Sequence, residues 1–190
     1  MEEYAKYIAL LKPTWYVLPD SKHDASKSVE LAKEFDDKYP RECYYSKSIG
    51  VIHGNNIDEM KKCYHDMYSI ADKLAFSFEG WWFDWAKENN IPTELIRPMI
   101  ISKIGIDFNK PHHILGCINP QEFKYYRKCN WIDSIDTSVP VAAALDGSVF
   151  HESTTRKPKS TIIGSFEEPL NKETIRHIEH NVKVFRNIIQ

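Results

Sequence analysis

The sequence predicts an α/β fold with a parallel sheet, specifically a partial TIM-type (β/α) barrel. Short apolar runs alternate with segments whose apolar residues recur about every 3.6 positions, as strands and crossover helices do. No glycine-rich phosphate-binding motif follows any of these runs, which argues against the usual doubly wound nucleotide-binding folds. Polar residues instead come just after the predicted strands, namely Asp20, His53 with Gly54, Glu79 and Asp136. A β/α barrel builds its active site at these positions.

The elements follow one another in a regular order along the chain. Strands are predicted at residues 14–20, 48–54, 74–78, 112–118 and 131–136. Helices are predicted at residues 22–38, 57–73 and 93–103, and a further one opens near residue 119. A complete eight-stranded barrel takes about 250 residues. With about five strands, this chain is expected to form only part of one.

Local signals justify the less regular elements. Asn119 is predicted to cap a helix that has Pro120 at its first position. The segment GWWFDWAKENNIP, residues 80–92, departs from the alternation and is interpreted as an insertion. Pro98 is expected in the first turn of the next helix or at a kink in it. The C-terminal segment 171–189 carries a single apolar stripe and is predicted to be a helix that packs on the core or at an interface.

Composition places the chain among ordinary globular proteins. Hydrophobic residues make up 42% and charged residues 27% of 190 residues, which predicts a single domain spanning residues 1–190. The net charge of −2 provides no general attraction for nucleic acid. The first residues are acidic where a signal peptide needs basic ones, and no apolar run is long enough to span a membrane, so a cytoplasmic location is expected. The four cysteines form no C-x-x-C pair, and no metal site is expected.

Two acids stand out in the stretch WIDSIDTSVP, residues 131–140. Asp133 and Asp136 lie within a β-branched apolar run, where strands disfavour aspartate. One interpretation is a strand-end turn in which Asp136 or Ser138 caps nearby backbone. The other is a catalytic carboxylate at the carboxyl end of a barrel strand.

Four segments in order resemble a known family. YVLPD, SIGVIHG, HHILGCINPQEF and IDSIDTSVP are similar, in sequence and approximate spacing, to segments of the tRNA-guanine transglycosylases. The resemblance is strongest to the phage and bacterial relatives that insert 7-deazaguanines into DNA. It covers roughly residues 4–147, and the LG-x-x-x-P segment followed by D-x-x-x-P is its most specific part.

This resemblance implies a glycosyltransferase that exchanges a base at a nucleoside. Asp136 matches the aspartate that attacks C1′ of the sugar and expels guanine, after which the incoming 7-deazaguanine displaces the carboxylate. Asp20 matches the aspartate that recognises the guanine edge, and Gly54 matches a residue that offers its backbone N–H to the base. No cofactor is implied, and DNA and tRNA both stay open as substrates.

Other positions match the family less closely. His53 stands where the tRNA enzymes carry glutamine; a neutral imidazole in the correct tautomer could still donate to a purine carbonyl. Glu79 falls near further pocket residues, and Asp133 is expected on the same side of the strand as Asp136, as a second-layer partner. The zinc-binding cysteine cluster of the tRNA enzymes is absent from this sequence. The basic clusters at 123–128 and 156–159 are more readily explained as solvated faces than as phosphate sites.

The early strands of the family's barrel have no counterpart in this sequence, which leaves three interpretations. An active enzyme could complete its barrel as a homodimer or with a partner subunit, since an exposed parallel edge is a liability. A catalytically inactive relative could bind a purine, nucleotide or deazaguanine as a carrier or sponge. A structural subunit of a larger modification complex would leave the strand-end carboxylates without a role.

Overall fold

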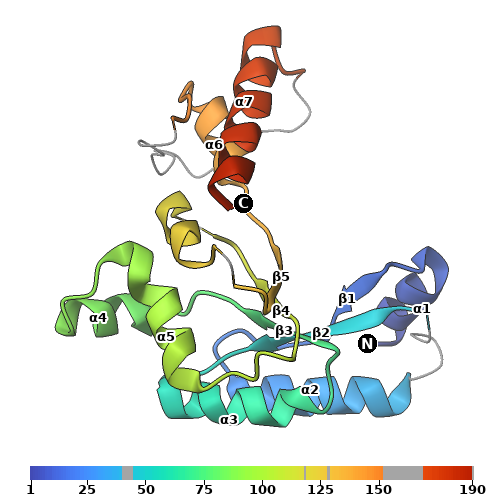
Figure 1. Cartoon of the computed structure of the whole chain (residues 1–190). Helices are drawn as coiled ribbons and strands as arrows, with labels where there is room; N and C mark the ends of the chain where they lie inside the picture. The colour runs from blue at the N-terminus through green and yellow to red at the C-terminus, as the bar shows by residue number, and fades with distance from the viewer. Residues whose placement is uncertain (40–44, 118, 128, 152–168, 190) are drawn as a thin grey trace.

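A curled five-stranded parallel sheet forms a half-barrel at the centre of the chain (Figure 1). The computed structural model describes residues 1–39, 45–117, 119–127, 129–151 and 169–189; the basic cluster at 156–159 lies outside them. The strands are β1 (Trp15–Val17), β2 (Lys47–Ile52), β3 (Lys73–Phe76), β4 (His112–Ile114) and β5 (Ile132–Ile135). Each strand pairs with the one before it, and all pairs are parallel. This sequential order is that of a barrel segment and differs from a doubly wound sheet, in which the order reverses.

Helices connect the strands and cover the outer face of the sheet. They are α1 (Glu2–Leu11), α2 (Ala25–Lys38), α3 (Ile57–Tyr68), α4 (Trp81–Glu88), α5 (Ile96–Ile104), α6 (Val139–Leu145) and α7 (Lys172–Ile189), with 3-10 helices η1 (Thr93–Leu95) and η2 (Pro120–Tyr125). Figure 1 shows α2 and α3 side by side along one side of the sheet, with α6 and α7 beyond β5. None of the helices in the described part of the chain is long and apolar enough to cross a membrane.

Side-chain caps fix where three of these helices begin. Asp24 accepts a hydrogen bond from the amide of Lys27 at the start of α2, and Asn56 does the same for Glu59 in α3. Asn119 accepts from the amide of Gln121 and precedes a proline, as predicted, although the element that follows is a 3-10 helix.

The core lies between the sheet and its helices. Tyr64 of α3 stacks on Phe76 of β3 and on His112 of β4, with ring centroids 6.2 and 5.8 Å apart. Burial lowers the pKa of His112 to about 4, and its Nε2 lies 3.1 Å from the Tyr64 hydroxyl. His112 is therefore a neutral core residue. Its neighbour His113 alternates to the opposite, concave face of the sheet.

Several sequence predictions need correction. The helix expected over 57–73 ends at Tyr68, because the chain turns at Ser69 to enter β3. The segment interpreted as an insertion contains α4. Two further helices, α1 and α6, were not predicted. The predicted C-terminal helix is confirmed as α7, and it packs through Phe185 on Phe123 of η2, with ring centroids 4.6 Å apart.

The two edges of the half-barrel differ. The amide of Leu18 donates to the carbonyl of Ile49 in β2. Because N–H and C=O of a trans peptide point in opposite directions, the Val17 carbonyl of the same peptide unit points away from the sheet. The Tyr4 hydroxyl of α1 donates to this carbonyl over 2.7 Å, which covers the outer edge of β1. By contrast, a cavity of about 440 Å³ runs along β5 and is lined by residues 132–135 together with Tyr126, Cys129 and Asn130.

Candidate functional site

Polar side chains gather at the carboxyl ends of the strands, where the sequence predicted them. Asp20 follows β1, His53 follows β2, Glu79 follows β3 and Asp136 follows β5. They form two separate hydrogen-bonded clusters. We call the cluster of Asp20, His53, Glu79 and His23 the β1–β3 cluster, and the cluster around Asp136 the β4–β5 cluster.

The β1–β3 cluster is a chain of four side chains. His53 Nε2 lies 2.7 Å from Asp20 Oδ2, and His53 Nδ1 lies 2.6 Å from Glu79 Oε1. The second Glu79 oxygen lies 2.5 Å from Nδ1 of His23. His53 and Glu79 are buried, whereas the Asp20 carboxylate is 35% exposed. His23 adopts a left-handed backbone conformation, with φ of 66°, and no sequence motif singled it out.

The carboxylates determine the charge of His53. Burial by itself lowers the pKa of His53, but the hydrogen bonds and negative charges of Asp20 and Glu79 outweigh it and raise the pKa to about 9. The pKa of Glu79 is raised by burial and lowered more by its bonds to His53 and His23, so that it lies below its usual value. At neutral pH, His53 is therefore an imidazolium whose two N–H groups are both occupied. This differs from the neutral imidazole expected from the sequence.

Gly54 allows the end of β2 to pack closely against α3. A Cβ at this position would lie 2.7 Å from the backbone nitrogen of Met60, so only glycine lets the strand end approach α3 this closely. The Gly54 carbonyl accepts a hydrogen bond from Nε1 of Trp81 over 2.6 Å. The supposed insertion therefore packs on the end of β2.

The β4–β5 cluster holds Asp136 by one oxygen. Asp136 Oδ1 lies 2.9 Å from His113 Nε2 and accepts the amide of Gly116 over 3.0 Å. Gly116 has a φ of 56°, a conformation that favours glycine, and this turn aims its amide at the carboxylate. The side chain of Asp136 is 57% exposed, and Oδ2 has no hydrogen-bond partner among the described residues. Gly116 of the sequence motif, together with His113, thus orients Asp136.

Behind Asp136 lies a buried lysine. Lys73 is 2% exposed and forms an ion pair with Asp133, while its Nζ lies 3.2 Å from Ser134 Oγ. The same ammonium lies 3.8 Å from the centre of the Trp15 ring. Asp133 therefore pairs with Lys73, and in the described part of the chain it forms no hydrogen bond or ion pair with Asp136, so its expected role as a partner of Asp136 is not observed. The two aspartates lie three positions apart, a spacing that a regular strand places on opposite faces.

A second buried ion pair ties two strand ends together. Arg97 of α5 donates to Glu122 over 2.7 Å and to the carbonyls of Phe76, which ends β3, and of Leu115, which directly follows β4. Both charged side chains are almost fully buried. An arginine within the apolar segment IRPMIISKI was the available sequence signal, since such a charge must be paired.

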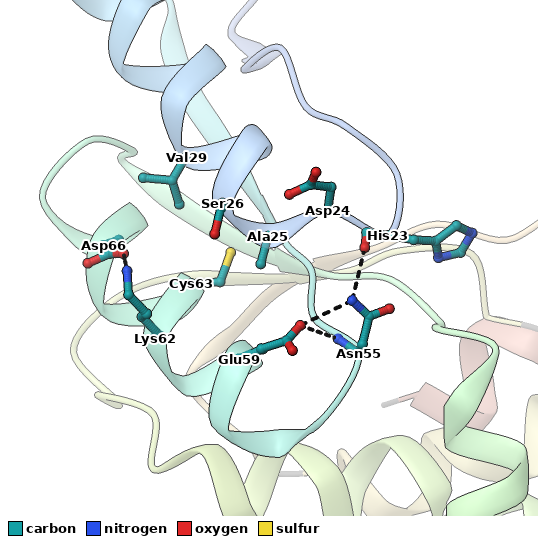
Figure 2. Close-up of a pocket in the computed structure, with 10 residues that line it drawn as sticks. All are labelled: His23, Asp24, Ala25, Ser26, Val29, Asn55, Glu59, Lys62, Cys63 and Asp66. Atoms are coloured by element: carbon teal, nitrogen blue, oxygen red, sulfur yellow. Dashed lines mark hydrogen bonds and ion pairs between the residues drawn. The ribbon is translucent and has the colours of Figure 1, made fainter.

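A polar cavity of about 340 Å³ lies between α2 and α3 and shares His23 with the β1–β3 cluster (Figure 2). Asn55 reaches across it from the carbonyl of His23 to the Glu59 carboxylate. Cys63 lines the cavity, and burial raises the pKa of its thiol to about 11, so the thiolate needed for nucleophilic chemistry is scarce at neutral pH.

Among the residues that the structure describes, no group of three or more His, Cys, Asp and Glu side chains has the arrangement of a metal site. Comparison with models of known protein families gives no match for this sequence, and neither does a search of curated proteins.

Proposed function

We propose that the chain is a base-exchange transglycosylase that replaces guanine in nucleic acid with a 7-deazaguanine, with Asp136 as the nucleophile. The arrangement of Asp136 carries this proposal. One oxygen is anchored by two contacts, and the other projects from the carboxyl end of a barrel-like strand. A turn cap would use its carboxylate on its own turn, whereas Asp136 is oriented by two groups from the neighbouring strand and loop.

The chemistry resembles that of retaining glycosidases. Asp136 Oδ2 attacks C1′, the glycosidic bond breaks, and its electron pair leaves with guanine, which takes up a proton. The ring nitrogen of the incoming base then attacks C1′, loses its proton and displaces the carboxylate. The two displacements retain the configuration at C1′ and need neither an oxidant nor a cofactor.

Base recognition is assigned to Asp20. Its Oδ2 binds the His53 imidazolium, which leaves Oδ1 to accept from the N–H groups of a guanine-like edge. His53 and Glu79 hold this carboxylate in place, and the buried Gly54 offers at most its backbone N–H. Asp20 and Asp136 follow the outermost strands, roughly 19 Å apart along the sheet at about 4.8 Å per strand, and the curl shortens this separation.

The partners follow from the same proposal. The half-barrel is assigned to the TIM type and is completed by a second copy or by a partner subunit. The polymer is DNA or tRNA, and the small-molecule partner is guanine or a 7-deazaguanine.

A purine-binding protein without catalytic activity is the second candidate. The β1–β3 cluster favours it, because this cluster is complete in itself and makes no use of Asp136. Such a protein would bind a free base as a carrier or sponge, or as a subunit of a larger complex.

Incorporation of labelled guanine into tRNA and into DNA tests the proposal. Wild-type protein is compared with Asp136→Asn and with the matched control Asp58→Asn, which changes a 95% exposed carboxylate on α3. We expect label in one polymer, retained by the control and reduced at least about 1,000-fold by Asp136→Asn, because the variant lacks the nucleophile. Equal incorporation by Asp136→Asn would refute the assigned role. Binding of guanine by a folded protein without incorporation would support the second candidate.

A further inference from the structure

Two side chains, those of Ser134 and His113, connect the buried ammonium of Lys73 to Asp136. Lys73 Nζ lies 3.2 Å from Ser134 Oγ, Ser134 Oγ lies 2.8 Å from His113 Nδ1, and His113 Nε2 lies 2.9 Å from Asp136 Oδ1. The side chains of His113 and Lys73 are 14% and 2% exposed, so water has little access to the hydrogen bonds that join them through Ser134.

The chemistry of each group limits which way the hydrogen bonds between Lys73 and Asp136 run. A lysine ammonium can only donate, so Ser134 Oγ accepts from Lys73. Ser134 keeps its own hydroxyl hydrogen to donate, and His113 Nδ1 lies within hydrogen-bond distance of that hydroxyl. The ionised carboxylate of Asp136 can only accept, so Nε2 of His113, which faces it, carries a proton.

We infer that Ser134 donates its hydroxyl hydrogen to His113 Nδ1, and that Lys73, Ser134 and His113 are positioning residues that fix the Nε2–H tautomer of His113 and thereby anchor Oδ1 of Asp136. Together with the Gly116 amide, the His113 N–H stops the carboxylate from rotating and presents Oδ2 for attack. The importance of this anchoring for catalysis rests on the proposed function. The tautomer itself is a property of the folded chain, whether or not the chain catalyses exchange.

Nitrogen-15 NMR of histidine-labelled protein tests the tautomer directly. The His113 resonances are assigned by their loss in His113→Gln. In the wild type we expect Nε2 to be protonated and Nδ1 not, and in Ser134→Ala and Lys73→Met we expect a mixture of tautomers, with the exposed His65 unchanged. A doubly protonated ring, an Nδ1–H tautomer, or an unaltered tautomer in both variants would overturn the inference.

Kinetics test the positioning role. His113→Gln keeps an amide N–H near the place of Nε2, whereas His113→Leu removes the donor. We expect His113→Leu to lower kcat for exchange by 10-fold to about 100-fold with little change in KM, and His113→Gln to recover most of the loss. A kcat for His113→Leu equal to that of the wild type, in protein that unfolds at the normal temperature, would refute the role. If the wild type exchanges no base, the proposed function fails, and the NMR result alone decides whether Lys73 and Ser134 fix the tautomer of His113.

Discussion

The charge of His53 should make the free energy of unfolding depend on pH, and the substitution His53→Gln should remove this dependence. The pKa of His53 is about 9 in the folded chain, against 6.5 for an unperturbed histidine. Because one pKa unit corresponds to about 1.4 kcal/mol, this difference contributes about 3 kcal/mol to the free energy of unfolding. A raised pKa means that the contribution is complete below pH 6.5 and is lost as the pH rises through about 9.

Urea unfolding between pH 6 and 9 measures this effect in the wild type and in His53→Gln. The free energy of unfolding of the wild type should fall by about 3 kcal/mol more than that of the variant across this range. His65→Gln, a change on the exposed face of α3, serves as the control and should follow the wild type. The range stops at pH 9 because the Cys63 thiol, whose pKa burial raises to about 11, adds a loss of its own above that pH.

The comparison has a clear failing result. If His53→Gln loses stability with pH as steeply as the wild type, His53 is not held as an imidazolium. A neutral ring has a single N–H and could donate to only one of Asp20 and Glu79. The Asp20 carboxylate would then lose the fixed positive partner on which base recognition depends.

Two further predictions concern the scaffold. Arg97→Met leaves the Glu122 carboxylate buried without its partner and should lower the free energy of unfolding by about 3–5 kcal/mol, measured in urea; an unchanged midpoint would contradict the buried ion pair. Gly54→Ala places a Cβ within 2.7 Å of the Met60 nitrogen and should cost about 1–3 kcal/mol in the same assay. A Gly54→Ala variant as stable as the wild type would show that β2 and α3 can separate freely.

The strand pattern was predictable because it depends on local sequence. Each strand is a short apolar run that ends where a polar residue appears, so the order of the strands also located Asp20, His53, Glu79 and Asp136. The parallel pairing followed from the helices in between. The helix α6 was missed because Pro140, taken as the end of a strand, lies in the first turn of a helix, where proline is favoured.

The partners of these residues were not predictable in the same way. His23 reaches Glu79 across 56 positions of sequence, and Lys73 reaches Ser134 across 61. These contacts depend on how far the sheet curls and on where the loops turn, and no local pattern encodes either. Asp133 illustrates the difficulty: its strand was predicted, but its partner Lys73 lies on a strand that is not adjacent to its own.

The two sheet edges restrict how a partner could complete the barrel. Closure by a second copy requires β5 of one chain to pair with β1 of the other, and the outer carbonyl of Val17 must then accept a strand amide in place of the Tyr4 hydroxyl. Such a dimer would have to move α1 away from β1. Among the described residues, no side chain forms such a hydrogen bond to the outer edge of β5 beside the open cavity, and the nearby Asp136 would face an added strand there. On these grounds, a partner that extends the sheet from β5 requires less rearrangement than closure at β1. Residues of that partner would then line the site beside Asp136, the proposed nucleophile.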